Sequence, residues 1–366
     1  MWSAPFLLKC LVKDKVYFVI FVNYYQEMKI LDELLRNGDL TDEGFATLIE
    51  GGDAALTDEL HRLARLEAEK RFGRQVYLRA LIEWTNVCRE DCLYCGIRRN
   101  NGNAVRYILT PSDVLAACGR AHADGIRTFV LQGGENPAAA EAMVPVVAEI
   151  RRRFPDSAIT LGFGELPFEL YAALREAGAD RYLMRHETAD PAHFGKLHPS
   201  GQTLAHRLDC LRELRRLGFQ IGMGMMVGSP FQTTAQLIAD LRLLQEWRPE
   251  MIGVGPFLPQ KDTPLGGHPA GSAEMTLRLY SILRLMLPDA NIPSTTALAS
   301  IMTGGRVRGI LAGANVIMPS YTPSGRGADY KLYDCKLQEG LQDILKELSA
   351  IGYGASPSRG DYKEFR

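Results

Sequence analysis

The chain has 366 residues, 46% of them hydrophobic, and its 42 basic and 43 acidic side chains leave a net charge of −1. A chain of this length and composition can bury a large core, while its balanced charge argues against a polyanion-binding protein, so we expect no nucleic-acid partner. Seven cysteines are too few, and odd in number, for a disulfide framework. We therefore expect a reducing, cytoplasmic location.

Residues 1–27 contain two apolar runs, but charged residues between positions 9 and 15 interrupt them. No stretch approaches the roughly 20 apolar residues that a membrane-spanning helix needs, so no membrane partner is expected. We interpret this segment as an appendage without visible chemistry. Residues 28–75 have the pattern of amphipathic helices, and Thr41 is the predicted N-cap of one of them.

Three cysteines follow the first predicted strand, VYLRALIEW at residues 76–84. Cys88, Cys92 and Cys95 have the spacing C-x3-C-x2-C. Three thiolates so close in sequence can hold three corners of a 4Fe–4S cube and leave the fourth iron open to bind and activate a small molecule. The spacing resembles the signature of radical S-adenosylmethionine (SAM) enzymes.

A zinc knuckle is the alternative interpretation of this loop. Structural zinc needs a fourth ligand, usually from a second C-x2-C or a suitably spaced histidine pair. His193 and His198 have such a spacing, but they lie roughly a hundred residues downstream. The other cysteines stand singly, at Cys10, Cys118, Cys210 and Cys335. The sequence therefore favours the cluster.

Short apolar strands alternate with amphipathic helices from about residue 76 to residue 320, which is typical of a parallel α/β sheet. Eight units favour a TIM-type (β/α)8 barrel with its chemistry at the carboxyl ends of the strands, and a doubly wound open sheet is the alternative. Residues 321–366 are predicted to form a loop, a helix and a tail. The predicted strands cover residues 76–84, 128–135, 159–165, 181–187, 220–228, 251–259, 292–299 and 315–320.

The second predicted strand ends in Gln132, Gly133, Gly134 and Glu135. Two glycines let other atoms approach the backbone closely, and Glu135 adds a carboxylate. Gly-Gly after a strand is commonly only a tight turn. Because this Gly-Gly pair lies one β/α unit after the cysteine loop, we predict that it belongs to the same site.

The fourth predicted strand places Arg181, Arg185 and Glu187 on one face, because side chains alternate along a strand. Burying these charges unpaired would cost several kcal/mol each, so we expect them at the polar mouth of the barrel, unless the strand prediction is wrong and they are solvated. Such a mouth suits an anionic substrate. Hydroxyl groups from neighbouring strands would complete the pocket, at Thr160, Thr295 and Thr296.

Several separated blocks resemble the HydE family of FeFe-hydrogenase maturases, relatives of biotin synthase and methylornithine synthase. They include NVCREDCLYCGIRRNN, LQGGE, RHETADP, KLHP, GPFLPQ and IPSTTAL, and the resemblance runs from about Met28 to the tail. It implies a closed barrel in which Cys88, Cys92 and Cys95 bind one 4Fe–4S cluster. Some family members have three further cysteines near the C-terminus, where this chain has only Cys335, so we predict no second cluster.

The resemblance also implies the contacts of SAM. Tyr94 would lie beside the adenine, the segment from Gln132 to Glu135 would contact the methionine end, Glu187 would hold hydroxyl or amine groups, and Arg207 would hold the carboxylate. The substrate positions would be Thr160, Arg181, Arg185, Thr295, Thr296, Tyr330 and Tyr333. The candidates for catalysis among them are Arg185, Thr295, Thr296 and Tyr333.

The activity implied is reductive cleavage of SAM to methionine and a 5′-deoxyadenosyl radical. The substrate would be a cysteine-bound iron carbonyl cyanide precursor, used during assembly of the two-iron subcluster of the hydrogenase. Sister maturases and a reductant such as ferredoxin or flavodoxin would be the partners.

Two rival functions stay open. A biotin synthase-like or methylornithine synthase-like enzyme, acting on an organic amino acid, would use the same barrel and cysteines. A noncatalytic iron–sulfur carrier would also use the cysteines. The Gly-Gly-Glu segment and Arg207 argue against the carrier, because it needs no groups that bind methionine.

Overall fold

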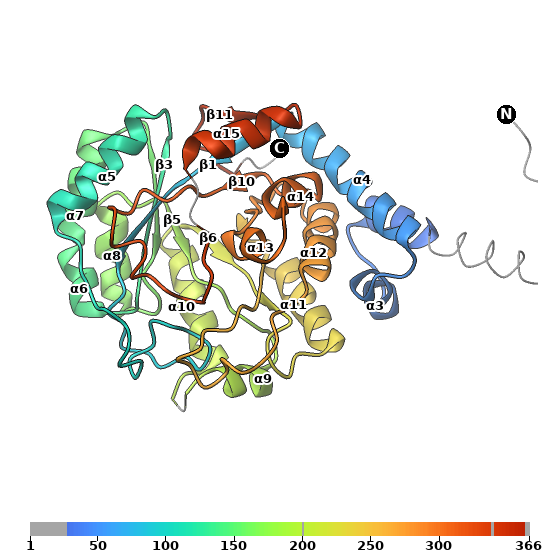
Figure 1. Cartoon of the computed structure of the whole chain (residues 1–366), viewed down its shortest axis with the longest axis horizontal. Coiled ribbons are helices and arrows are strands. Elements are labelled where there is room, and N and C mark those ends of the chain that lie inside the picture. Colours follow the sequence, from blue (N-terminus) through green and yellow to red (C-terminus); the bar gives the residue numbers. More distant parts are fainter. Residues whose placement is uncertain (1–27, 200, 338–339, 363–366) are drawn as a thin grey trace, which may run out of the picture.

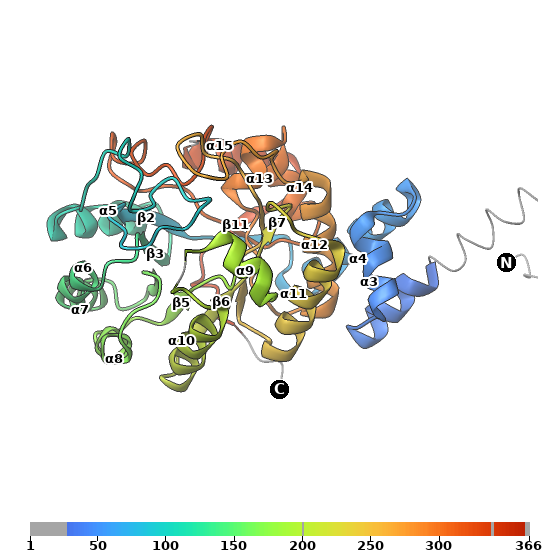
Figure 2. The same ribbon diagram turned by 90° about the horizontal axis from the view of Figure 1, so that it is seen from below.

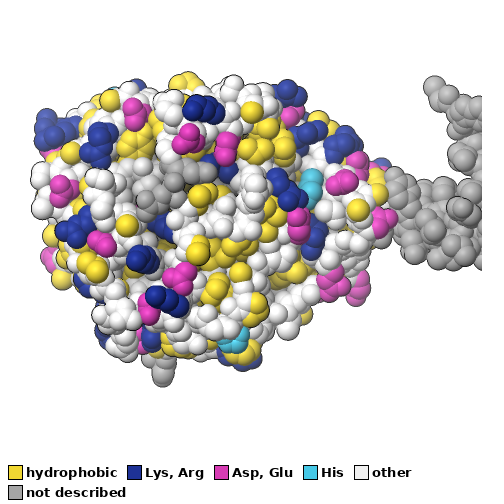
Figure 3. All heavy atoms as spheres, viewed as in Figure 1, with side chains coloured by type: hydrophobic (Ala, Val, Ile, Leu, Met, Phe, Trp, Pro, Cys, Tyr) yellow, Lys and Arg dark blue, Asp and Glu magenta, His cyan; other side chains and the backbone are white. Residues whose placement is uncertain are grey.

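The computed structural model describes residues 28–199, 201–337 and 340–362. The predicted appendage at residues 1–27 lies outside them. None of the described helices is both long and apolar enough to cross a membrane. Acidic and basic side chains are interspersed over the face drawn in Figure 3, as expected for a nearly neutral chain.

Helices precede the first strand, as predicted. Residues 28–37 are helical, followed by α3 (Asp42–Glu50) and α4 (Ala54–Phe72). Thr41 caps α3, because its side chain accepts a hydrogen bond from the Gly44 backbone at 3.2 Å. Helix α4 buries an apolar stripe spaced by four residues, and it packs against α12 (Ala273–Met286) at one side of the barrel (Figures 1 and 2).

Parallel strands form the centre of the molecule (Figure 1). The main sheet has six strands in the order β2-β3-β4-β5-β6-β8, while β1 pairs with β10 and β11, and β7 pairs with β9. The strands are β1 (Gln75–Leu78), β2 (Ala80–Thr85), β3 (Thr128–Gly133), β4 (Ala158–Gly162), β5 (Arg181–Leu183), β6 (Gln220–Met223), β7 (Met226–Val227), β8 (Met251–Ile252), β9 (Gly255–Pro256), β10 (Val316–Ile317) and β11 (Gly354–Ser356).

Isolated bridges close the sheet into a barrel. Met251 of β8 bridges to Asn291, Pro293 bridges to Val316 of β10, and Leu81 of β2 bridges to Ser320, all in parallel. The eight strand positions form a ring, which confirms the TIM-type barrel and contradicts the open sheet.

All eight predicted strands differ in extent from the structure, and three of them show the main kinds of difference. The first divides at Arg79, and the fourth ends at Leu183. The seventh is wrong beyond its first residues, because the Thr295 side chain caps helix α13 (Thr296–Ile301) by accepting a hydrogen bond from the Leu298 backbone at 3.3 Å. Adjacent threonines are common in strands, but a threonine hydroxyl can also cap the start of a helix, as it does here.

Helices surround the strands in both views (Figures 1 and 2). Thr110 and Thr233 begin two of them with reciprocal capping boxes. The remaining helices are α5 (Pro111–Ala123), α6 (Pro137–Ala142), α7 (Val144–Arg153), α8 (Phe168–Glu176), α9 (Pro191–Leu197), α10 (Leu204–Arg216), α11 (Thr234–Trp247), α14 (Gly305–Leu311) and α15 (Leu341–Ala350).

Alternate side chains of each strand point to opposite sides of the barrel wall. Ile159 and Leu161 of β4 join the core between strands and helices, so Thr160 between them points to the interior. Strand register places one row of residues beside Thr160: Leu81, Val130, Arg181 and Gln220. The interior is therefore lined by both apolar and charged side chains.

The C-terminal segment covers the end of the barrel where the strands begin. The Arg359 carbonyl accepts a hydrogen bond from the hydroxyl of Thr128, at the start of β3, at 2.8 Å. The Gly360 carbonyl accepts one from the Asn291 amide at 3.2 Å. Gly360 has φ +62°, and an added Cβ would lie 2.7 Å from the ring of Tyr77, so glycine is required there.

Candidate active site

The cysteine loop begins where β2 ends. Cys88, Cys92 and Cys95 are free and partly exposed. Arg106 holds the loop through hydrogen bonds from its guanidinium to the carbonyls of Asn86 and Ile97, both at 2.7 Å. The loop is therefore fixed by the strand below it and by a neighbouring side chain.

The environment of the three thiols suits a metal cluster. Burial raises the pKa of Cys88 and Cys92, and it raises the pKa of Cys95 to about 12, so these thiols need the positive charge of a metal to ionise. Three thiolates from one loop suit a 4Fe–4S cube with one open iron, as the spacing C-x3-C-x2-C predicted.

The two glycines at the end of β3, Gly133 and Gly134, leave room for β2 and the cysteine loop to pack closely against them. A Cβ on Gly134 would lie 2.6 Å from the Val87 carbonyl and 2.9 Å from the Cβ of Cys88. A Cβ on Gly133 would lie 2.6 Å from the indole nitrogen of Trp84. The two segments are therefore in direct contact, as their places in the sequence predicted.

Glu135 lies beside the loop with both oxygens engaged. The Glu135 backbone N–H points to the Cys88 sulfur at 3.3 Å, and its carboxylate pairs with Arg89 at 2.8 Å and accepts a hydrogen bond from the Glu165 backbone at 2.7 Å. Burial, together with the charge of Glu165, raises the pKa of Glu135 to about 7. Small changes around this carboxylate therefore alter its charge near neutral pH.

Arg207 is buried on α10 and is not a surface arginine. Its Nε donates to Glu165 at 2.8 Å, and its guanidinium lies 5.1 Å from the centre of the Phe194 ring. Burial lowers the pKa of Arg207, but the charge of Glu165 outweighs this and raises it above its usual value. The guanidinium is a fixed positive charge. It acts to lower the pKa of Cys92, against the larger effect of burial.

Arg185 and Glu187 lie beyond β5. They form an ion pair at 3.0 Å, and Glu187 adopts the left-handed conformation with φ 66°. Its Oε2 is buried and has no hydrogen-bond partner in the described part of the chain. A strained acidic residue with a free buried oxygen is the pattern of a ligand contact.

Tyr94 lies in the cysteine loop, where the charge of Glu187 acts on its hydroxyl. Its hydroxyl lies 3.3 Å from Nε2 of His198, and burial, followed by the charge of Glu187, raises its pKa well above the usual value. His198 stacks on Phe194 with ring centres 3.8 Å apart, while His193 pairs with the Pro230 carbonyl at 3.0 Å. The two histidines are thus packing residues, not a zinc pair.

Arg181 is not with Arg185 and Glu187, so the prediction of one charged mouth was wrong for this residue. It points into the interior where the strands begin, pairs with Asp361 at 2.7 Å and donates to the Arg359 carbonyl at 2.9 Å. The Thr160 hydroxyl, in the same row, is buried and has no partner among the described residues.

The remaining predicted residues lie on the loops above the barrel. The Thr295 hydroxyl is 3.2 Å from that of Tyr280, and the Tyr330 hydroxyl accepts a hydrogen bond from Gln132 at 3.4 Å. The charge of Arg185 acts on Tyr333, and burial raises the pKa of that tyrosine to about 12.

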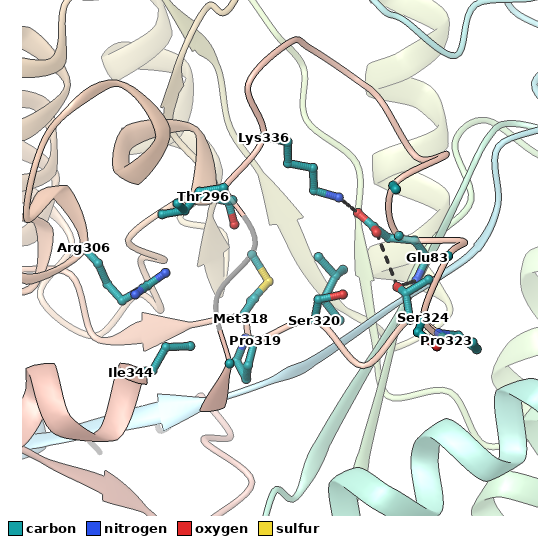
Figure 4. A pocket seen from close by; sticks show the side chains of 17 residues that line it. Glu83, Thr296, Arg306, Met318, Pro319, Ser320, Pro323, Ser324, Lys336 and Ile344 are labelled. Carbon is teal, nitrogen blue, oxygen red and sulfur yellow. Dashed lines mark hydrogen bonds and ion pairs between the residues drawn. The ribbon is translucent and has the colours of Figure 1, made fainter. Parts of the chain in front are cut away.

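Thr296 lines a cavity of about 300 Å³ between α13 and the loop after β10. Figure 4 shows Lys336 reaching toward Glu83, with Thr296 and Arg306 across the cavity. Glu83 is buried on the interior face of β2, where burial raises its pKa and Lys336 opposes the rise. The cavity connects one predicted substrate position with a buried ion pair.

Sequence reasoning missed several charged residues at this end and in the interior. Arg79 and Glu83 alternate with apolar residues in VYLRALIEW, so the period of two already placed both on the inner face. Arg79 is buried, and its Nε and Nη2 have no partner in the part of the chain that the structure describes. Lys336 lies in a loop, where no periodicity signals a role, and Glu165 lies in the loop after β4 although the third predicted strand extended to it.

Comparisons with known proteins agree with this geometry. A family model described as the radical SAM superfamily matches residues 82–244. The chain is 43% identical over 310 residues to the FeFe-hydrogenase maturase subunit HydE of Thermotoga maritima, spanning 84% of this chain and 88% of that protein. It is 29% identical over 335 residues to the 3-methylornithine synthase of Methanosarcina barkeri, spanning 90% and 93%.

Solved structures share the fold. The crystal structure of methylornithine synthase (PylB) aligns with a TM-score of 0.79 and 25% identity, over 89% of this chain and 97% of that one. The structure of HydG, a maturase of the FeFe-hydrogenase, aligns with a TM-score of 0.78 and 21% identity, over 90% and 76%. At that identity the second likeness concerns the fold alone.

Proposed function

The chain belongs to the HydE family of FeFe-hydrogenase maturases within the radical SAM superfamily, and we propose that its substrate is a cysteine-bound iron carbonyl cyanide precursor of the two-iron subcluster. Enzymes of this superfamily use a 4Fe–4S cluster and SAM. The observation that carries the substrate proposal is a set of buried donor atoms inside the barrel that have no partner among the described residues, namely Nε and Nη2 of Arg79 and the Thr160 hydroxyl.

We assign the cluster to Cys88, Cys92 and Cys95. When bound, the reduced cluster and SAM together supply a 5′-deoxyadenosyl radical. We assign SAM binding to Tyr94, Gln132, Gly133, Gly134, Glu135, Glu187 and Arg207. The unpartnered Glu187 oxygen and the fixed charge of Arg207 support this assignment, because SAM carries an amine, hydroxyls and a carboxylate.

Substrate binding is assigned to the interior and to the loops above it. A cysteine carboxylate and cyanide ligands both accept hydrogen bonds, and buried guanidinium and hydroxyl groups donate them. Arg185, Thr295, Thr296 and Tyr333 are the candidates for contact with the reacting part, while Thr160 and Tyr330 line the remainder. A closed interior also keeps water from a reactive radical.

The partners follow from this assignment. We propose that a sister maturase supplies the precursor, that a ferredoxin or flavodoxin reduces the cluster, and that the protein works in the reducing cytoplasm.

A second candidate is a methylornithine synthase-like enzyme acting on an organic amino acid. It is favoured by the 29% identity to the 3-methylornithine synthase over nearly the whole of both chains. The same cysteines and SAM contacts would serve both reactions, so only the substrate pocket distinguishes them.

The test has two stages. Anaerobically reconstituted, dithionite-reduced protein is incubated with SAM, and methionine and 5′-deoxyadenosine are measured; no cleavage with the cluster verified would favour the iron–sulfur carrier. The chain is then expressed in a hydrogenase-producing strain that lacks its own HydE. Restored hydrogenase activity supports the maturase. SAM cleavage without restored activity would favour the organic substrate.

A further inference from the structure

Three metal-ligating side chains of different types meet outside the cysteine loop. His206 and Cys210 lie one turn apart on α10, and Glu165 comes from the loop after β4. The Cys210 sulfur is 3.7 Å from Nε2 of His206, and that nitrogen is 3.6 Å from Oε2 of Glu165. All three ligand atoms lie within 4.8 Å of one another.

The separations from Nε2 of His206 to the other two ligand atoms match edges of a tetrahedron around a zinc ion. With zinc–sulfur bonds of about 2.3 Å and zinc–nitrogen bonds of about 2.0 Å, tetrahedral ligands lie roughly 3.5 Å apart. A sulfur, an imidazole nitrogen and a carboxylate oxygen are also the three ligand types that zinc accepts. The side chains therefore need little movement to bind one ion.

Burial and charge fit a divalent cation. The side chains of Cys210 and Glu165 are buried, whereas that of His206 is 58% exposed, which gives an entry path and leaves a fourth position to water. A thiolate and a carboxylate together balance a charge of +2, and the carboxylate would be shared with the guanidinium of Arg207. Binding releases the Cys210 proton to solvent.

Neighbouring groups hold two of the ligands in place. Arg207 occupies the other oxygen of Glu165 at 2.8 Å and so orients the carboxylate. Burial raises the pKa of Cys210 to about 11, and a hydrogen bond with Tyr171 opposes that rise. Partners behind the ligands are typical of metal sites.

A thiol–imidazole hydrogen bond on a helix face is the plainer interpretation of two of these residues. It does not include Glu165, whose Oε1 pairs with Arg207 while its Oε2 faces His206. We propose that Glu165, His206 and Cys210 form a site for one divalent cation of the zinc type, separate from the iron–sulfur cluster.

The first measurement uses the cluster-loaded protein and zinc ions. One zinc per chain should bind while the iron content stays at about four per chain, as one cube requires. X-ray absorption at the zinc edge does not detect iron, and it should show one sulfur at about 2.3 Å with nitrogen or oxygen at about 2.0–2.1 Å. Absence of the sulfur shell, or loss of iron in step with zinc uptake, would overturn the proposal.

Variants then identify the ligands. Cys210→Ser and His206→Ala should each weaken zinc binding about tenfold or more, and the exposed His206 can be changed with little risk to folding. The matched control is Cys118→Ser, which alters another buried free cysteine outside the site. Unchanged zinc affinity in both ligand variants, or equal weakening in the control, would contradict the site.

Discussion

The charged groups at the two ends of the barrel differ in whether they have partners within the chain. Where the strands begin, Arg181 has a carboxylate and a carbonyl partner from the C-terminal segment, at Asp361 and Arg359. Where the strands end, Glu187 keeps a buried oxygen without a partner in the described chain. Buried polar groups are nearly always satisfied, so Arg181 is satisfied by the chain itself, whereas the free oxygen of Glu187 suits a ligand. Four predictions test this contrast.

The largest effect is expected at the cysteine loop. Cys92→Ala removes one of three cluster ligands and should abolish the cluster, measured as iron per chain after anaerobic reconstitution. Cys118→Ala, at a buried cysteine away from the loop, is the control and should retain the cluster. An intact cube in the Cys92 variant would remove the basis for assigning chemistry to this end.

Arg185→Met should abolish maturation of the hydrogenase but leave the iron–sulfur cluster intact. Methionine keeps an apolar stem of similar reach but lacks the donors, and losing charge-assisted hydrogen bonds to a buried anion costs on the order of 2–5 kcal/mol. Hydrogenase activity in the complemented strain is the readout, with iron content and substrate-free SAM cleavage as internal checks. Arg308→Met, at an arginine on the outer helix α14, is the matched control. Full activity of the Arg185 variant would show that the anion pocket lies elsewhere.

Asp361→Asn should lower stability without changing the chemistry. It leaves the guanidinium of Arg181 buried without a charged partner, and because Asp361 is 43% exposed we expect a loss of only about 2 kcal/mol. The melting temperature should fall, while SAM cleavage by the folded protein stays the same. Asp343→Asn breaks an exposed pair and should have little effect. If Asp361→Asn instead impaired cleavage at unchanged stability, the two ends would not be separate in function.

His198 gives the smallest expected effect, and it depends on pH. Burial lowers its pKa from 6.5 to about 3, so the unfolded chain binds a proton that the folded chain does not over that range. Stability from this residue is therefore present above pH 6.5 and is lost as the pH falls, by about 1.6 kcal/mol between pH 6.5 and pH 5. The melting temperature of the parent should drop more steeply with acid than that of His198→Gln. Parallel pH profiles would contradict the buried neutral imidazole.

Local patterns in the sequence predicted the barrel and the cysteine loop. Alternation of strands and helices needs only short windows, and the contact between Gly134 and the loop follows from their order along the chain. Where two local signals competed, at Thr295 and Thr296, the strand prediction was wrong because capping prevailed. The roles predicted for the individual site residues stay predictions.

Distant partners were not predictable. Asp361 neutralises Arg181 although it lies 180 residues away in the chain, and no sequence pattern around either residue indicates its partner. Glu165 is similar, because its place at the end of a predicted strand gives no sign that it lies beside Arg207 and Cys210. Long-range pairing depends on the closed barrel, which brings both residues together only after folding.

The pairing of β1 has a consequence for synthesis. Both of its partners, β10 and β11, come from the opposite end of the chain. At roughly 5–20 residues per second, the ribosome needs on the order of ten seconds or more to reach them after β1 emerges. During that interval an apolar strand edge stays open to other nascent chains. The pairing of β1 can therefore be completed only late in synthesis, after both β10 and β11 have left the ribosome.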